Sequence, residues 1–238
     1  MKGNKLKLNT GEAILSNFHM QQFEYETLNY SNKDENISEI LNVLNKCKIV
    51  EIKTKKWYRA RKIKGKDENI IWNERGIPIR GYNSEQSGVA PAMYISAGRA
   101  NEKEEQVLYV AEDENTALRE IKIGSTDYAS MAYCMLDENI KMLDFTPYSN
   151  IQLEEYTNDQ FHADKDKGSF IWIQRILTLP EYAEDEYVIS RKVVSLIKEN
   201  IKVSGMLYIS HYTGKKNIAI WDEHKFTTFS EGKVVHGV

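Results

Sequence analysis

Two arginines on one short segment are the first candidates for chemistry. In Trp57–Arg61, a strand would place the side chains of Arg59 and Arg61 on one face and that of Tyr58 on the other. A guanidinium binds phosphate oxygens through two parallel hydrogen bonds, so this pair could capture an anion. Two arginines on a solvated strand face are equally ordinary, and the pattern alone leaves both interpretations open.

A carboxylate candidate lies further along the chain. The segments Gly98–Asn101, Leu108–Ala111 and Thr116–Glu120 read as a loop, a strand and a helix. Glu120 would lie beside the apolar face of that helix, at the edge of a cleft, where a carboxylate can stabilise positive charge that develops on a substrate. A solvated helix glutamate is the alternative. The composition of the segment alone favours that alternative.

A hydroxyl candidate ends a third segment. The strand Gly205–Ser210 is followed by a turn that contains Gly214 and by a second strand from Asn217. Ser210 would emerge where a strand meets its loop, which is a common place for a site residue, although a serine there can also satisfy turn backbone groups. A Ser-His-acid hydrolase is not indicated, because Ser210 and His211 would point to opposite sides and there is no nucleophile elbow.

Together, and in this order, these segments resemble the RES domain family, which is named for its Arg, Glu and Ser. The resemblance spans about residues 50–225, and the matching positions are Arg59, Glu120 and Ser210. Two features depart from the usual pattern. Family members often have Gly-Arg-Trp or a Pro-Lys-Gly turn after Asn, whereas here Ala100 follows Arg99 and Glu-Lys-Glu-Glu follows Asn101; the segment 62–97 is also longer than in the compact toxins.

The resemblance implies an α+β fold like that of ADP-ribosyltransferase toxins, with a bent, mostly antiparallel sheet and few helices. It implies a toxin of a bacterial toxin–antitoxin pair that consumes NAD+ by hydrolysis or phosphorolysis. NAD+ would be the substrate, with no cofactor and no metal, and the partner would be an antitoxin with a helix-turn-helix domain.

The resemblance also suggests a role for each candidate residue. Arg59, Glu120 and Ser210 would be catalytic: Arg59 holds the pyrophosphate, Glu120 stabilises the ribose cation, and Ser210 orients the ribose or nicotinamide. Five further residues would bind the substrate: Tyr58, Arg61, Arg99, Tyr109 and Asn217. Within this set, Arg99 would assist at the pyrophosphate, and Tyr58 and Tyr109 would line the nicotinamide.

Three other functions stay open. The chain could transfer ADP-ribose to a protein, or it could be a module that binds NAD+ without turnover. A nucleic-acid-binding surface is the third, because aromatic residues interrupt a basic run; its members are Lys53, Lys55, Lys56, Arg59, Arg61, Lys62, Lys64 and Lys66. The formal net charge of −3 weakens that third function.

The elements that position these residues follow from local composition. Strands are expected where β-branched and aromatic residues gather, namely at 57–61, 106–111, 131–136, 170–177, 205–210 and 217–221. Helices are expected at about 115–122 and at 190–200, where Ser190 would be the cap. Apolar spacing from Ile37 to Leu44 indicates a further helix with Asn36 as its cap.

The chain is expected to comprise an N-terminal extension, residues 1–50, which is partly helical, and a catalytic domain, residues 51–238. The extension could cap the site, bind a partner or form a homo-oligomer. With 32 Lys and Arg against 35 Asp and Glu, no secretory pattern at the start and only two cysteines, a cytoplasmic protein without membrane contact is expected. The five histidines are scattered along the chain, so the local sequence predicts no metal site.

Overall fold

The computed structural model describes residues 33–53, 55–65, 67–136, 139–148, 173–174, 176–177 and 187–237. The chain divides into two compact units, Met1–Asn42 and Val43–Val238, which are described separately. The described part of the first unit belongs to helix α2 (Lys33–Lys46), which extends across the division. This helix begins before Asn36, so the expectation that Asn36 caps it is wrong. The domain boundary at residue 50 stays a prediction.

The second unit is built on one large sheet. Its strands lie in the order β1-β7-β8-β9-β5-β2-β6-β10, and every neighbouring pair is antiparallel except β7 and β8. The bounds are β1 (Lys48–Glu51), β2 (Lys56–Ile63), β5 (Leu108–Ala111), β6 (Tyr128–Met135), β7 (Lys141–Asp144), β8 (Gly205–Ile209), β9 (Lys216–Ile220) and β10 (Lys233–His236). This confirms the predicted α+β class with a mostly antiparallel sheet.

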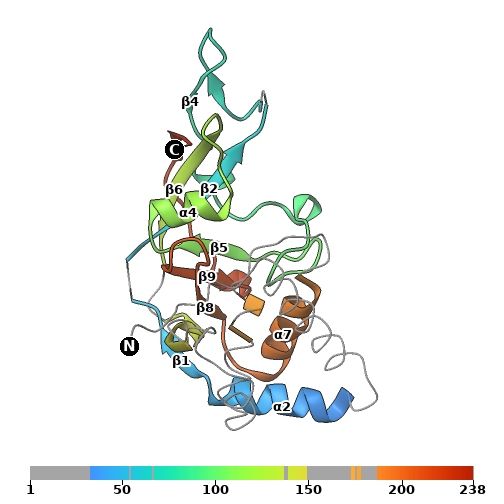
Figure 1. Cartoon of the computed structure of the whole chain (residues 1–238). Coiled ribbons are helices and arrows are strands. Elements are labelled where there is room, and N and C mark those ends of the chain that lie inside the picture. The colour runs from blue at the N-terminus through green and yellow to red at the C-terminus, as the bar shows by residue number, and fades with distance from the viewer. Residues whose placement is uncertain are drawn as a thin grey trace, which may run out of the picture. The chain divides into compact units, whose positions relative to one another are not determined.

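The sheet opens between β2 and β5. Strand β2 pairs with β6 along its whole length, from Lys56 to Ile63, but it pairs with β5 only through Tyr58 and Ala111. Beyond that pair β2 and β6 run away from β5, β9 and β8, as Figure 1 shows. Helix α4 (Glu114–Glu120) lies against β2 and β5 at this junction. The opening between β2 and β5 therefore brings strand β2, which carries Arg59, close to helix α4, which carries Glu120.

The remaining described elements connect strands of the large sheet along the chain. They are α3 (Ser84–Ser87), α7 (Tyr187–Asn200), the 3-10 helices η1 (Ala92–Tyr94), η2 (Thr146–Tyr148) and η4 (Glu223–Lys225), and a two-stranded sheet of β3 (Ile71–Trp72) and β4 (Pro78–Arg80). Helices α4 and α7 confirm the two expected helices. Ser190 lies inside α7, where its hydroxyl donates to the Tyr187 carbonyl at 3.0 Å, so its expected role as the cap is wrong.

The strand expected at 170–177 is wrong for the residues that the structure describes there. Residues 173–174 and 176–177 are helical. Ile173, Ile176 and Leu177 are all buried, and their spacing of three and four residues is that of one helix face. A helix buries these three side chains on one side, whereas strand alternation would separate Ile176 from Leu177.

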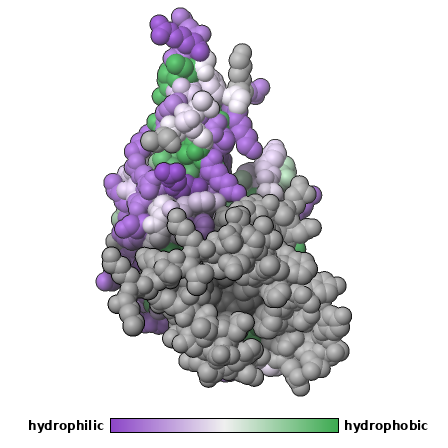
Figure 2. Space-filling model, in the orientation of Figure 1, coloured by the Kyte–Doolittle hydropathy of each residue, from purple (hydrophilic) through white to green (hydrophobic). Residues whose placement is uncertain are grey.

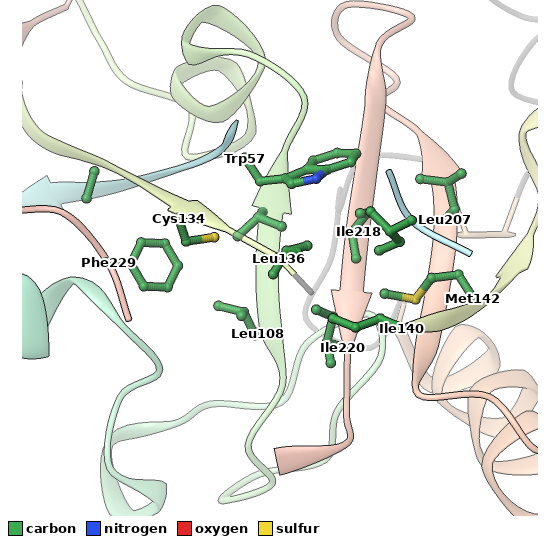
Figure 3. Close-up of a cluster of buried hydrophobic side chains, with 13 residues drawn as sticks. Trp57, Leu108, Cys134, Leu136, Ile140, Met142, Leu207, Ile218, Ile220 and Phe229 are labelled. Carbon is green, nitrogen blue, oxygen red and sulfur yellow. The ribbon is translucent and has the colours of Figure 1, made fainter. Parts of the chain in front are cut away.

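The main hydrophobic cluster lies on one side of the sheet and spans the opening between β2 and β5. Side chains from β2, β5, β6, β7, β8 and β9 pack together there, and Figure 3 shows Trp57, Leu108, Cys134 and Ile218 among them. The opposite side of β2 carries Tyr58, which packs with residues of α4.

The surface over α4, β2 and β6 is mostly hydrophilic in the view of Figure 2, with hydrophobic residues interspersed toward β4. Ile79 of β4 is among the exposed large hydrophobic side chains. Within the described ranges, no helix is long and apolar enough to cross a membrane.

Candidate functional site

Helix α4 is anchored at both the start and the middle of its length. Asp113 is the N-cap, and its side chain accepts a hydrogen bond from the Thr116 backbone N–H at 2.7 Å. The Thr116 hydroxyl oxygen lies 2.9 Å from that of Thr213, in the turn between β8 and β9. Since Ser210 begins that turn, this contact joins the Glu120 helix directly to the Ser210 loop.

The carboxylate of Glu120 is held by an asparagine that lies 97 positions further along the chain. The Asn217 side-chain Nδ2 donates to Glu120 Oε1 at 2.7 Å. Asn217 is buried on β9, where it is in register with Ala111 of β5 and Tyr208 of β8. Its Oδ1 is also buried and has no hydrogen-bond partner among the described residues. Leaving a buried acceptor unpaired costs about 1–3 kcal/mol.

Ser210 lies one residue beyond β8 and is buried. Its Oγ accepts a hydrogen bond from the Tyr212 backbone N–H at 3.2 Å, and its backbone carbonyl accepts from Gly214 at 3.0 Å. Gly214 has a φ of 67°, a left-handed conformation that suits glycine in a tight turn. Ser210 is therefore a turn residue, and no described residue accepts a hydrogen bond from its hydroxyl. That hydroxyl could still donate to a ligand.

Tyr208 is a further candidate that the sequence reasoning missed. Its side chain is buried in β8, two residues before Ser210 and in register with Asn217. Burial raises the pKa of Tyr208, and the Glu120 carboxylate raises it further. The available signal was strand alternation, which places Tyr208 on the same side of the sheet as the partner of Glu120.

Arg59 places one unpartnered guanidinium nitrogen near the junction of β2 and β5. Its Nη1 is buried, and no hydrogen-bond partner for that atom exists among the described residues. Burial and then the neighbouring Arg61 guanidinium lower the pKa of Arg59 to about 10, so the side chain stays protonated at neutral pH. Burying a guanidinium nitrogen without an acceptor is costly, and an anionic ligand would supply that acceptor.

The other two arginines of the predicted site are engaged by the chain itself. Arg61 donates to the Gly88 carbonyl at 3.2 Å and lies 5.3 Å from the centre of the Tyr82 ring. Arg99 is buried and donates to the Ile176 carbonyl at 3.0 Å. These contacts give both guanidiniums a structural task, and their part in substrate binding stays a prediction.

Tyr109 fixes the loop that carries Arg99. The Tyr109 hydroxyl accepts from the Ala100 backbone N–H at 2.8 Å and donates to Asn101 Oδ1 at 2.9 Å. A Cβ at Gly98 would lie 2.6 Å from the same Asn101 oxygen, so the close approach of this loop requires glycine. Burial raises the pKa of Tyr109, which keeps its hydroxyl protonated.

The three name-giving residues do not form one hydrogen-bonded cluster. Glu120 is bonded to Asn217, and Ser210 is joined to the same region through the Thr213 turn. Among the described residues, no hydrogen bond or ion pair joins Arg59 to either Glu120 or Ser210. Tyr58 packs on the α4 side of the sheet.

The arrangement offers a carboxylate for a developing cation and a guanidinium for an anion. The described residues contain no group of three or more His, Cys, Asp or Glu that could hold a metal ion. Two buried atoms, Arg59 Nη1 and Asn217 Oδ1, lack a hydrogen-bond acceptor and a hydrogen-bond donor respectively. A phosphate oxygen has the chemistry to satisfy the first, and a hydroxyl group has the chemistry to satisfy the second.

Comparisons with known proteins place this architecture in a family. No curated protein matches the chain by sequence. A chain from the crystal structure of the M. tuberculosis MbcT–MbcA toxin–antitoxin complex is similar, with 10% sequence identity and a TM-score of 0.42, over 84% of this chain and 92% of that chain. The family model described as the RES domain matches residues 49–233, which is most of the chain. The chain belongs to the RES domain family.

Proposed function

We propose that the chain cleaves the bond between nicotinamide and ribose in NAD+, as the toxin of a toxin–antitoxin pair. The observation that carries this proposal is the Glu120 carboxylate, which accepts a hydrogen bond at 2.7 Å from a buried asparagine on the central strand β9. Membership of the RES family supports it, together with the unpartnered guanidinium of Arg59.

Each residue has a physical task in this reaction. The bond from ribose C1′ to the pyridinium nitrogen breaks, and both of its electrons pass to nicotinamide, which leaves as a neutral molecule. The ribose becomes oxocarbenium-like, as in glycoside cleavage, and Glu120 stabilises that positive charge. Arg59 holds the pyrophosphate, and Ser210 donates a hydrogen bond that orients the ribose or the nicotinamide.

The reaction ends when an acceptor takes up the ADP-ribosyl group. Water attacks C1′ and releases one proton to give ADP-ribose, or phosphate attacks to give ADP-ribose phosphate. The proposal covers both a glycohydrolase and a phosphorylase, since the candidate residues act on the leaving group and the cation rather than on the acceptor. No cofactor or metal takes part in the proposed steps.

Product analysis tests the reaction. The pure chain is incubated with NAD+ labelled in the adenylate half, with and without phosphate, and the products are separated by chromatography. We expect nicotinamide in equal amount to ADP-ribose or its phosphate. Label on protein would instead favour a transferase, and binding of NAD+ without nicotinamide release would refute the enzymatic proposal.

Growth experiments test the toxin role. Induced expression of the wild-type chain in a bacterial host should stop growth and deplete cellular NAD+, whereas Glu120→Gln should do neither at equal protein level. Co-expression of the protein encoded next to this chain should restore growth if that protein is the antitoxin. Growth arrest by Glu120→Gln as strong as by wild type would contradict this role.

A further inference from the structure

Asn217 has a contact pattern that stability alone does not explain. It is buried within β9, yet only one end of its amide is used: Nδ2 donates to Glu120 Oε1 at 2.7 Å, while Oδ1 is buried without a described partner. A buried amide with a purely structural task normally satisfies both ends. The one bond that it makes is to the carboxylate of the proposed reaction.

The position of Glu120 explains why such a bond is needed. Glu120 is the last residue of α4, a helix of seven residues, and residues at helix ends are the least restrained. Asn217 sits in a central strand that is paired on both sides, with Ala111 of β5 and with Tyr208 of β8. A rigid donor is therefore aimed at a carboxylate that its own helix holds weakly.

We propose that Asn217 is a positioning residue for Glu120, and that its free Oδ1 is left to accept a hydrogen bond from a hydroxyl of the bound ribose. The bond from Nδ2 occupies one carboxylate oxygen and fixes the direction of the other. This inference rests on the proposed function for the ligand, whereas the contact between Asn217 and Glu120 can be tested without it.

The kinetic test separates positioning from simple binding. Asn217→Ala removes the donor, and we expect kcat for nicotinamide release to fall about 10- to 100-fold, because hydrogen bonds to charged groups are among the stronger ones. KM for NAD+ should change by less than the fall in kcat. Asn115→Ala, at an exposed position of the same helix, is the matched control and should leave both constants unchanged. A rise in KM with kcat intact would overturn the positioning role.

A stability test works even if NAD+ is not the substrate. Asn217→Asp places two carboxylates against each other and should lower the melting temperature. Adding Glu120→Gln restores the hydrogen bond in the opposite direction, because the new glutamine amide can donate to the new aspartate carboxylate. The double variant should therefore melt at a higher temperature than Asn217→Asp alone. If the second substitution lowers the melting temperature further, the contact does not exist in solution and the inference fails. If the double variant melts higher while wild type releases no nicotinamide, the proposed function fails and the contact stands.

Discussion

Replacing Arg59 by methionine should make the protein more stable while it removes the proposed anion contact. Arg59 Nη1 is buried and has no described partner, so the native state leaves one nitrogen of this cation without an acceptor. Methionine has a similar length and no charge, and it can fill the same space between the strands. A residue kept for stability would give the opposite result on removal.

The size of the effect follows from the pKa of Arg59, which burial and then the Arg61 guanidinium lower from the ordinary arginine value to about 10. Each pKa unit corresponds to about 1.4 kcal/mol, so the charged form is disfavoured in the native state by about 3 kcal/mol. The Arg59 side chain as a whole is only partly buried, and solvent screening therefore reduces this penalty to about 1–2 kcal/mol. For a unit of this size, the melting temperature should rise by about 3–6 °C.

The pH dependence of stability independently tests whether the charge of Arg59 destabilises the folded protein. Below the folded-state pKa of about 10, Arg59 is charged in both the folded and the unfolded state, and the penalty is fully present. The penalty disappears as the pH rises from there toward the ordinary pKa of arginine in the unfolded chain. The advantage of Arg59→Met over wild type should therefore be constant near neutral pH and shrink above about pH 10.

Arg61→Met is the matched control for the thermal melts. Arg61 lies on the same strand, but its guanidinium donates to the Gly88 carbonyl and stacks near the Tyr82 ring. Its loss should lower the melting temperature or leave it unchanged. The reasoning is refuted if Arg59→Met melts below wild type, or if both variants gain stability equally.

Three further results are expected. Asp113→Ala removes the cap of α4 and should cost about 1 kcal/mol of unfolding free energy, measured by urea denaturation, with a matching loss of Glu120-dependent nicotinamide release; unchanged stability would contradict the cap. Tyr109→Phe removes two hydrogen bonds of its hydroxyl and should cost about 1–3 kcal/mol, whereas a neutral result in the same denaturation assay would show that the loop is held otherwise. Burial raises the pKa of Cys47 and of Cys134 to about 12, so neither thiol should react with iodoacetamide at about pH 8 until the protein unfolds; mass spectrometry showing rapid labelling of the folded protein would disprove their burial.

Much of the sheet could be predicted from local composition. The strands around Arg59 and Ser210 are rich in β-branched and aromatic residues, and they appear where they were expected. Shorter strands such as Lys48–Glu51 and Lys233–His236 were missed, because four residues carry too little periodicity. At 173–177 the apolar composition favoured a strand, although the spacing of the buried side chains is helical.

The site could be predicted only in part. Residue types and order indicated Glu120 and Ser210, but the bond from Asn217 to Glu120 joins positions that are 97 residues apart. Nothing in the local sequence distinguishes Arg59, whose Nη1 is left free, from Arg61, which is bound to the Gly88 carbonyl. These contacts join segments that are distant along the chain, and no local pattern specifies them.

Nicotinamide release at saturating NAD+ by the wild-type chain and by Glu120→Gln is the most direct measurement of the central claim. The substitution keeps the shape of the side chain and an oxygen that can accept from Asn217, but it removes the negative charge. Stabilisation of a developing cation by Glu120 predicts that the rate falls at least about 100-fold while the folded structure persists. Equal rates from the two proteins would contradict the proposed chemistry.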